Sequence, residues 1–202
     1  MKTYPTIPRK IQTSEPIYAF DKLDGSNIRA EWSRKRGFYK YGTRKRLLSP
    51  DERPLGLAVQ LINDVYGDEL IRRLKDARVD SAVCYFEFFG VNSFAGFHEE
   101  GDDFEVVLFD VSLFKKGFLP PKEFIKFTDG LITPDVVYHG NANQEFIDSV
   151  RQSTLDDVTY EGVVCKYARK KVIHMFKIKS SAWLTRLKKK CGDDEKLFQQ
   201  LV

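Results

Sequence analysis

The sequence has few of the residues that build disulfide frameworks and zinc sites. Its 202 residues include three cysteines and three histidines, all widely spaced along the chain. Such usage is typical of the reducing cytosol, and the spacing excludes the common zinc-binding patterns. No apolar run approaches the roughly 18 residues that a transmembrane helix needs, and the N-terminus lacks the apolar core of a signal peptide. We therefore expect a cytoplasmic protein without a membrane partner.

The chain also lacks a strong excess of charge of either sign. Lysine and arginine together number 33 and the acidic residues 29, which gives a net charge of +4. Hydrophobic residues make up 42% and charged residues 31%, so a mostly disordered chain is excluded. Basic residues cluster at positions 34–36, 44–46, 166–171 and 188–190. This balance permits a polyanionic partner without requiring one, and each cluster alone fits a solvated face equally well.

The spacing of apolar residues predicts both strands and helices. The expected strands cover residues 17–20, 27–32, 38–41, 82–89, 104–114, 162–167 and 172–179. Helices are expected within 54–78 with a possible break at Gly67, after Pro120, over 143–151, and after a cap at Ser180. Strand pairs and separated helices in this order predict an α+β fold with mainly antiparallel sheets flanked by helices.

The most informative peptide is Lys-Leu-Asp-Gly-Ser-Asn at residues 22–27. Lys22 follows an apolar strand and precedes an Asp-Gly turn, where glycine permits backbone angles that other residues resist. An ammonium group at such a turn can approach a phosphate closely. Taken alone, the peptide fits an ordinary hairpin turn with a surface lysine at least as well.

Three later peptides change this interpretation. Glu87 lies within the aromatic strand Tyr-Phe-Glu-Phe-Phe-Gly, where a charge is costly without a partner or ligand. Glu161 precedes a glycine and an apolar strand that ends in Lys166. Lys177 and Lys179 are two residues apart, so they share one face of a strand. Each peptide alone has an ordinary structural explanation, but their joint occurrence in this order is much less expected by chance.

Together these peptides resemble the ordered motifs of the covalent nucleotidyltransferases, which comprise ATP-dependent DNA and RNA ligases and mRNA capping enzymes. The similar segments are 22–27 (motif I), 41–46 (Ia), 87–90 (III), 107–110 (IIIa), 161–166 (IV) and 177–179 (V). The last position of motif I is arginine in many DNA ligases and capping enzymes, whereas this chain has Asn27 there. In this position the chain resembles the RNA ligases of the repair type, which are related to phage RNA ligase 2.

The resemblance implies a single nucleotidyltransferase domain over residues 1–202, with an ATP cleft between its sheets and helices. Motif VI is not found, and the 23 residues after Lys179 (202 − 179) are too few for a C-terminal oligonucleotide-binding barrel. Phage-type RNA ligases usually carry a further C-terminal helical domain, of which this chain has only the first helix or two. Strand sealing is therefore less strongly implied than self-adenylylation.

The implied activity is an ATP-dependent RNA ligase with a lysyl–AMP intermediate. Lys22 attacks the α-phosphate of ATP, AMP moves to an RNA 5′-phosphate, and a 3′-hydroxyl then seals the strand. Lys177 and Lys179 stabilise the charge, and Glu161 holds Mg²⁺ or Mn²⁺. The residues implied to bind ATP are Asp24, Asn27, Arg44, Glu87, Phe109 and Lys166. Phe109 has two interpretations, an adenine-stacking platform or a core residue.

Two alternatives stay open from the sequence. One is a minimal DNA ligase or nick-repair enzyme. The other is a nucleic-acid-binding module that has kept the fold and lost the chemistry, although every expected reactive position is filled. The expected partner is RNA with 5′-phosphate and 3′-hydroxyl ends, as in a nicked duplex. A helper protein or a homodimer is a further candidate partner.

Overall fold

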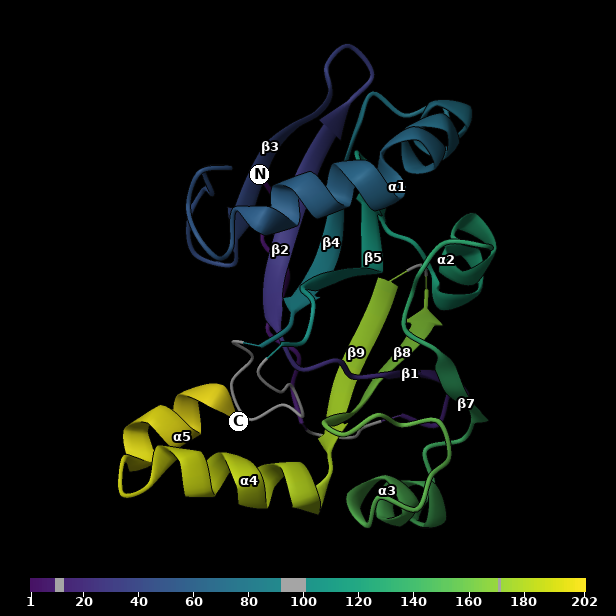
Figure 1. Ribbon diagram of the computed structural model, residues 1–202. Coiled ribbons are helices and arrows are strands. Elements are labelled where there is room, and N and C mark those ends of the chain that lie inside the picture. Colours follow the sequence, from purple (N-terminus) through teal and green to yellow (C-terminus); the bar gives the residue numbers. More distant parts are fainter. Residues whose placement is uncertain (10–12, 92–100, 171) are drawn as a thin grey trace. The chain divides into compact units, whose positions relative to one another are not determined.

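The computed structural model describes residues 1–9, 13–91, 101–170 and 172–202 (Figure 1). These residues divide into two compact units. Unit 1 comprises residues 1–6, 25–91 and 101–133, and unit 2 comprises residues 7–9, 13–24, 134–170 and 172–202. The chain passes between them after Asp24, inside the peptide that carries Lys22.

Unit 1 is built on a five-stranded antiparallel sheet in the order β3-β2-β4-β5-β6. Its strands are β2 (Ser26–Ser33), β3 (Gly37–Thr43), β4 (Ser81–Phe89), β5 (Glu105–Leu113) and β6 (Gly117–Phe118). Helix α1 (Leu57–Asp76) runs across one face of this sheet, and α2 (Pro121–Phe127) follows β6 (Figure 1). The largest fully buried side chains here are Trp32, Tyr66, Tyr85, Phe86 and Phe124.

Helix α1 continues through Gly67, so the break considered at that position does not occur. Ala58, Ile62, Tyr66, Leu70 and Leu74 are buried at spacings of four residues, which places them on one face of the helix. A glycine inside a helix costs only about 1 kcal/mol relative to alanine. The burial of large side chains directly before and three residues after Gly67 outweighs that cost.

Unit 2 is built on a four-stranded antiparallel sheet in the order β7-β1-β8-β9. Its strands are β1 (Ile17–Asp21), β7 (Val136–Gly140), β8 (Gly162–Arg169) and β9 (Val172–Lys179). Helix α3 (Gln144–Arg151) packs Phe146, Ile147 and Val150 against one face of this sheet. Helices α4 (Ser181–Cys191) and α5 (Glu195–Leu201) lie side by side and enclose a smaller apolar cluster (Figure 1).

The predicted α+β class with mainly antiparallel sheets is confirmed. The expected caps are also present, because the side chains of Asn143 and Ser180 accept hydrogen bonds from backbone N–H groups of α3 and α4. Strand β7 and a separate helix α5 were not predicted. β7 is a short edge strand without a buried residue, so its sequence carries little alternation. No helix in the described part of the chain is both long and apolar enough to cross a membrane.

Candidate active site

The sheet of unit 2 has one apolar face and one face that carries lysines. Its apolar face packs against α3 and contains Ile17, Ala19, Val163, Cys165, Phe176 and Ile178. Strand residues alternate between faces, so their neighbours Phe20, Lys166, Lys177 and Lys179 point to the opposite side. Val164 pairs with both Phe20 and Lys177, which brings β1 and the two lysines of β9 onto one surface.

Glu161 lies directly before β8 and joins two of the predicted catalytic lysines. Its Oε2 accepts a hydrogen bond from Nζ of Lys22 at 2.7 Å, and its Oε1 pairs with Nζ of Lys179, also at 2.7 Å. The Glu161 and Lys179 side chains are each 4% exposed and that of Lys22 is 20% exposed. A buried carboxylate of this kind is stable only with such partners. Burial lowers the pKa of Lys179, and the charge of Glu161 opposes that shift.

Gly162 explains how a carboxylate and two lysines come so close together. Its φ of +127° is strained for residues with a side chain, and a Cβ there would lie 2.1 Å from the backbone oxygen of Ile178. Its carbonyl oxygen accepts a hydrogen bond from the backbone N–H of Lys22 at 2.9 Å. Glycine at this position therefore lets β9 and the residues after β1 approach the start of β8.

Lys177 completes a group of three ammonium groups in unit 2, but it does not form a salt bridge with Glu161 among the described residues. Its Nζ donates a hydrogen bond to the backbone oxygen of Val202 at 2.9 Å, and Nζ of Lys179 donates to that of Leu201 at 3.2 Å. Burial, followed by the charges of Lys179 and Lys22, lowers the pKa of Lys177 to about 8. An anion bound by this pair must therefore share the ammonium groups with carbonyl oxygens at the end of α5.

Asp24 is held by a residue that sequence analysis missed. The indole Nε1 of Trp183 donates a hydrogen bond to Oδ2 of Asp24 at 3.0 Å. Burial and then the charge of Glu161 raise the pKa of Asp24, while the hydrogen bond from Trp183 lowers it. Nζ of Lys179 lies 3.6 Å from the centroid of the Trp183 ring. The signal was present in the sequence, since Trp183 comes four residues after Lys179 and at the start of a capped helix.

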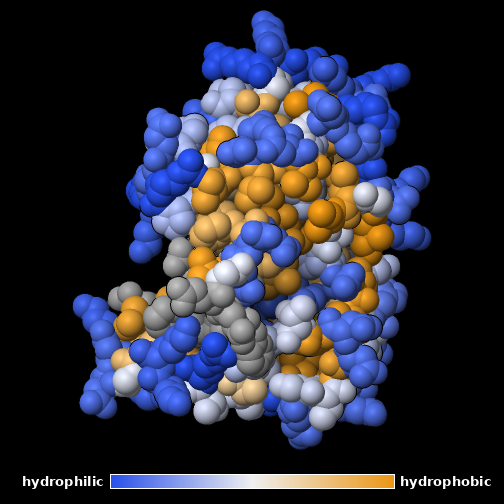
Figure 2. Space-filling view, in the orientation of Figure 1, coloured by the Kyte–Doolittle hydropathy of each residue, from blue (hydrophilic) through white to orange (hydrophobic). Residues whose placement is uncertain are grey.

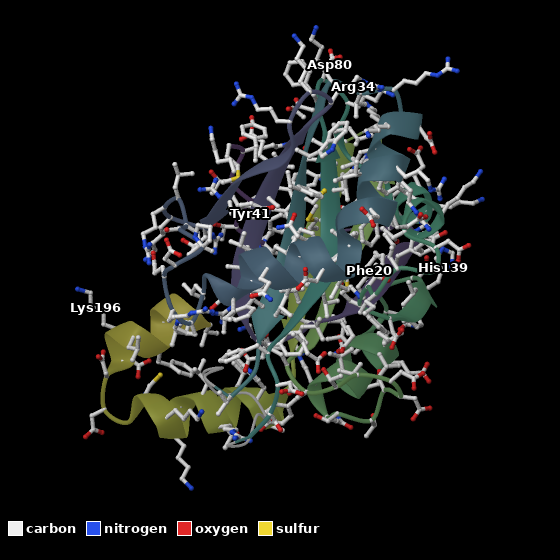
Figure 3. The ribbon with its side chains drawn as sticks, turned by 45° about the horizontal axis from the view of Figure 1, so that its top comes forward. Phe20, Arg34, Tyr41, Asp80, His139 and Lys196 are labelled. Carbon is white, nitrogen blue, oxygen red and sulfur yellow. The ribbon has the colours of Figure 1, made fainter. Side chains whose placement is uncertain are left out.

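Lys166 lies on the same face as Lys177 and is 4% exposed. Its Nζ is 5.0 Å from the centroid of the Phe20 ring, one of the residues labelled in Figure 3. A lysine on this face can add to the positive charge beside Glu161. Its contact with ATP stays a prediction.

The remaining predicted site residues belong to unit 1. Asn27 and Glu87 are direct partners in the register of β2 and β4. Oε1 of Glu87 accepts a hydrogen bond from the backbone N–H of Gly25 at 3.1 Å. A Cβ on Gly25 would lie 2.5 Å from the backbone oxygen of Phe88, so this turn requires glycine. Oδ1 of Asn27 is buried and has no hydrogen-bond partner among the described residues.

Phe109 contacts Tyr4, and Arg44 contacts Thr6, in unit 1. Phe109 is the additional residue of a bulge in β5, and its ring packs edge-on against Tyr4 with the centroids 4.9 Å apart. It is half-buried, as a core residue at the edge of an aromatic cluster would be. Arg44 is exposed and donates a hydrogen bond to Oγ1 of Thr6 at 2.8 Å. The roles of both residues stay predictions.

Tyr4 and Asp110 form a separate buried pair in unit 1. The Tyr4 hydroxyl donates a hydrogen bond to Oδ2 of Asp110 at 2.8 Å. Burial, followed by the charge of Asp110, raises the pKa of Tyr4 well above its usual range. Asp110, which falls in the segment similar to motif IIIa, therefore has a structural partner.

The carboxylates of unit 2 fit a divalent metal only in combination with another source of oxygen ligands. No group of three or more metal-binding side chains is found in the described part of the chain. Mg²⁺ is commonly held by one or two carboxylates together with water and substrate phosphates. Glu161, with Asp24 close enough for the two charges to interact, matches that donor set.

The chain was compared with known protein families, curated proteins and solved structures. It matches the family model described as RNA ligase over residues 15–182. No curated protein matches the sequence.

Three solved structures of the Naegleria gruberi RNA ligase are similar to it. A variant with AMP and Mn gives a TM-score of 0.62 at 16% identity, over 91% of this chain and 59% of that chain. A variant with ATP and Mn gives a TM-score of 0.62 at 20% identity, and the ligase with PPi gives a TM-score of 0.62 at 19% identity. Each of the latter two covers 86% of this chain and 52% of that chain.

At these identities the structural likeness shows the fold. The chain spans only 52 to 59% of the length of these relatives. The family model, in contrast, covers most of the 202 residues and includes Lys22, Glu87, Glu161 and the lysines of β9. On that match, the chain belongs to the RNA ligase family.

Proposed function

We propose that this chain is an ATP-dependent RNA ligase that forms a lysyl–AMP intermediate on Lys22. The observation that carries the proposal is the arrangement of Lys22 and Lys179 on the two oxygens of one buried carboxylate, Glu161. A buried acid holding two lysines on one sheet face is expensive to maintain for stability alone, because replacing buried ion pairs by apolar residues is often neutral or stabilising.

The first chemical step is assigned to Lys22. The lone pair of the neutral Nζ forms a bond to the α-phosphorus of ATP, the bond from that phosphorus to the bridging oxygen breaks, pyrophosphate leaves, and Nζ releases one proton to water. Lysine attacks only as the neutral amine, and deprotonating a reference lysine at pH 7 costs roughly 4.6 kcal/mol, from 3.4 units at 1.36 kcal/mol each. Glu161 orients the amine and favours its charged form, whereas the positive charges of Lys177 and Lys179 favour its neutral form.

Charge develops on the α-phosphate during this step, so fixed cations beside it stabilise the transition state. We assign that role to Lys177 and Lys179, with Lys166 on the same face. A divalent metal, Mg²⁺ or Mn²⁺, bound at Glu161 would supply further positive charge to the phosphate oxygens. In the later steps, an RNA 5′-phosphate takes AMP from Lys22, and a 3′-hydroxyl displaces AMP to form the new phosphodiester.

Recognition of the nucleotide is assigned to unit 1. Oδ1 of Asn27 is an acceptor, so it suits a hydroxyl of the nucleotide or of the acceptor strand. We assign Glu87 to the ribose hydroxyls, Phe109 to the adenine, and Arg44 to the ribose or the 5′-phosphate.

RNA binding is assigned to the exposed basic clusters. The turn between β2 and β3 carries Arg34, Lys35 and Arg36, all exposed, at a hydrophilic end of unit 1 (Figure 2). A cavity of about 400 Å³ opens there, lined by Ser33, Arg34, Lys35, Arg36, Tyr39 and Asp80. Arg34 and Asp80 lie together at that end (Figure 3). A nicked duplex is the proposed substrate, and a helper protein or a second copy of the chain is a further proposed partner.

Incubation with α-labelled ATP and Mg²⁺, followed by a denaturing gel, tests the first step. A labelled chain whose label is lost in Lys22→Ala supports the proposal, and an unlabelled wild-type chain contradicts it. Sealing by pre-adenylylated enzyme on matched nicked RNA, hybrid and DNA duplexes then tests the substrate. Preference for a DNA nick would favour the minimal DNA ligase instead.

A further inference from the structure

Trp183 connects two parts of the candidate site that are 155 residues apart in sequence, Asp24 and Lys179 (179 − 24). Its indole N–H donates to Oδ2 of Asp24 at 3.0 Å, and its ring face lies 3.6 Å from Nζ of Lys179. The side chain is almost completely buried, with 3% exposed. Only tryptophan offers both a π-face of this size and an N–H donor.

The backbone of Trp183 is itself held in place. Strand β9 ends at Lys179, and Ser180 then caps α4 by accepting a hydrogen bond from the backbone N–H of Trp183 at 3.1 Å. The side chain also packs with Leu187, Cys191 and Val202 in the apolar cluster of α4 and α5. Trp183 is thus a rigid support next to two charged groups.

We infer that Trp183 is a positioning residue for lysine adenylylation, which holds the Asp24 carboxylate through its N–H and the Lys179 ammonium against its ring. The inference rests on the proposed function. Without the indole N–H, the Asp24 carboxylate loses a hydrogen-bond donor. It can then turn away from the nearby negative charge of Glu161. Without the ring, the Lys179 side chain is no longer confined on that side. Both changes misplace groups next to Lys22 without removing any of them.

The chain provides its own matched control, because it has two tryptophans and both are buried. Trp32 lies in β2 with 0% exposed, and its Nε1 has no hydrogen-bond partner among the described residues. Trp32→Phe therefore removes the same atoms from a core without breaking a hydrogen bond. A purely structural role for Trp183 predicts that Trp183→Phe and Trp32→Phe behave alike.

The test measures adenylylation of Lys22 with α-labelled ATP in single turnover over a range of ATP concentrations. We expect Trp183→Phe to lower the maximal rate about tenfold, the scale of one hydrogen bond to a charged group. Trp183→Leu should lower it about a hundredfold, because this variant also removes the cation–π interaction. The half-saturating ATP concentration should change little in either variant, and Trp32→Phe should keep both values.

Two further measurements separate positioning from folding. Asp24→Ala removes the acceptor of the hydrogen bond, so adding Trp183→Phe to it should cost little more, whereas independent effects would multiply. In the absence of ATP, an amine-acylating reagent mapped by mass spectrometry should modify Lys179 faster in Trp183→Leu than in the wild type. If Trp183→Phe does not fold, Trp183→Tyr repeats the test with another aromatic face.

The outcomes distinguish this inference from the proposed function. If the wild-type chain is not labelled, the proposed function fails and the inference fails with it. If the wild type is labelled and Trp183→Phe matches Trp32→Phe, only the positioning role is overturned. The positioning role is also overturned if Trp183→Phe changes only the half-saturating ATP concentration. It is overturned as well if the effects of Trp183→Phe and Asp24→Ala on the rate multiply.

Discussion

Units 1 and 2 both carry candidate site residues, but they hold their polar groups in opposite ways. In unit 2, Lys22, Glu161 and Lys179 compensate one another's charge within hydrogen-bond distance. In unit 1, Glu87 accepts from a backbone N–H, and Oδ1 of Asn27 is buried without a partner in the described structure. Clustered, mutually compensating charges suit a step in which charge is redistributed, whereas fixed hydrogen-bond donors and acceptors suit recognition.

Under the proposed function, each unit controls a different kinetic quantity. Substitutions in unit 2 are expected to lower the rate at saturating ATP. Substitutions in unit 1 are expected to raise the ATP concentration needed for half saturation.

Lys22→Ala should abolish labelling of the chain by α-labelled ATP, and Lys22→Arg should do so as well, because arginine cannot be deprotonated in practice. A denaturing gel measures both. Lys196→Ala is the matched control, since Lys196 is an exposed lysine of α5 (Figure 3) and should label as the wild type does. Undiminished labelling of Lys22→Ala would remove the basis for assigning the chemistry to unit 2.

Glu161→Gln and Lys179→Ala should each lower the rate of adenylylation at saturating ATP by about a hundredfold, the scale of losing one charge-stabilising group. Glu161→Gln should also lower the melting temperature, because two ammonium groups lose their buried counter-charge. Single-turnover labelling and thermal melts measure the two effects. If both variants keep the wild-type rate, Glu161 and Lys179 are a structural ion pair and the contrast between the units disappears.

Lys177 should make the efficiency of adenylylation depend on pH. With a pKa lowered to about 8, its ammonium group is about 90% protonated at pH 7 and about 10% at pH 9. The ratio of kcat/KM for Lys177→Arg to that for the wild type should therefore rise up to about tenfold between these pH values, since arginine keeps its charge. A flat ratio would show that the Lys177 charge does not act on ATP.

The lowered pKa of Lys177 should change folding stability and kcat/KM in opposite directions as the pH rises. This difference provides a control. A lysine with a folded pKa below its unfolded value binds fewer protons when folded, so its contribution to folding stability rises between pH 8 and about 10.4. Loss of kcat/KM above pH 8 from deprotonation of Lys177 is therefore not accompanied by unfolding from that group. Melting curves at pH 7 and pH 9 check this.

In unit 1, Asn27→Ala and Glu87→Gln should raise the half-saturating ATP concentration about tenfold, the scale of one hydrogen bond to a nucleotide, with little change in the maximal rate. ATP titrations of single-turnover labelling measure both quantities. Asn63→Ala, which removes an exposed amide on α1 that bonds Tyr41, is the control. A large loss of maximal rate with unchanged half saturation would break the division between the units.

The smallest effect on adenylylation is expected at the turn between β2 and β3. Arg34→Ala together with Arg36→Ala should weaken RNA binding more at low salt than at high salt, because it should reduce the salt slope by roughly 0.7 to 0.9 for each phosphate that these arginines neutralise. Filter binding of nicked RNA across a salt series measures the slope, and labelling by ATP should not change. An unaltered slope would remove this turn from the RNA-binding surface.

The sequence predicted the main elements because their signals are local. Alternating polar and apolar residues marked the strand that carries Asn27, apolar runs marked the strands that carry Glu87 and Lys177, and the caps at Asn143 and Ser180 marked two helix starts. It did not predict β7, because an edge strand without a buried residue has no strong periodicity. It allowed a break at Gly67, because the cost of a helical glycine is local whereas the packing of Tyr66 and Leu70 that offsets it is tertiary.

By itself, the sequence determined which residue types could carry the chemistry and in which order they occur. That follows from composition and spacing, and the match to the RNA ligase family rests on the same information. Only the tertiary structure decided which of them meet. Lys22 and Glu161 are 139 residues apart, and Asp24 and Trp183 are 159 apart. Such contacts depend on strand register and on close approach at Gly162, which no local pattern specifies.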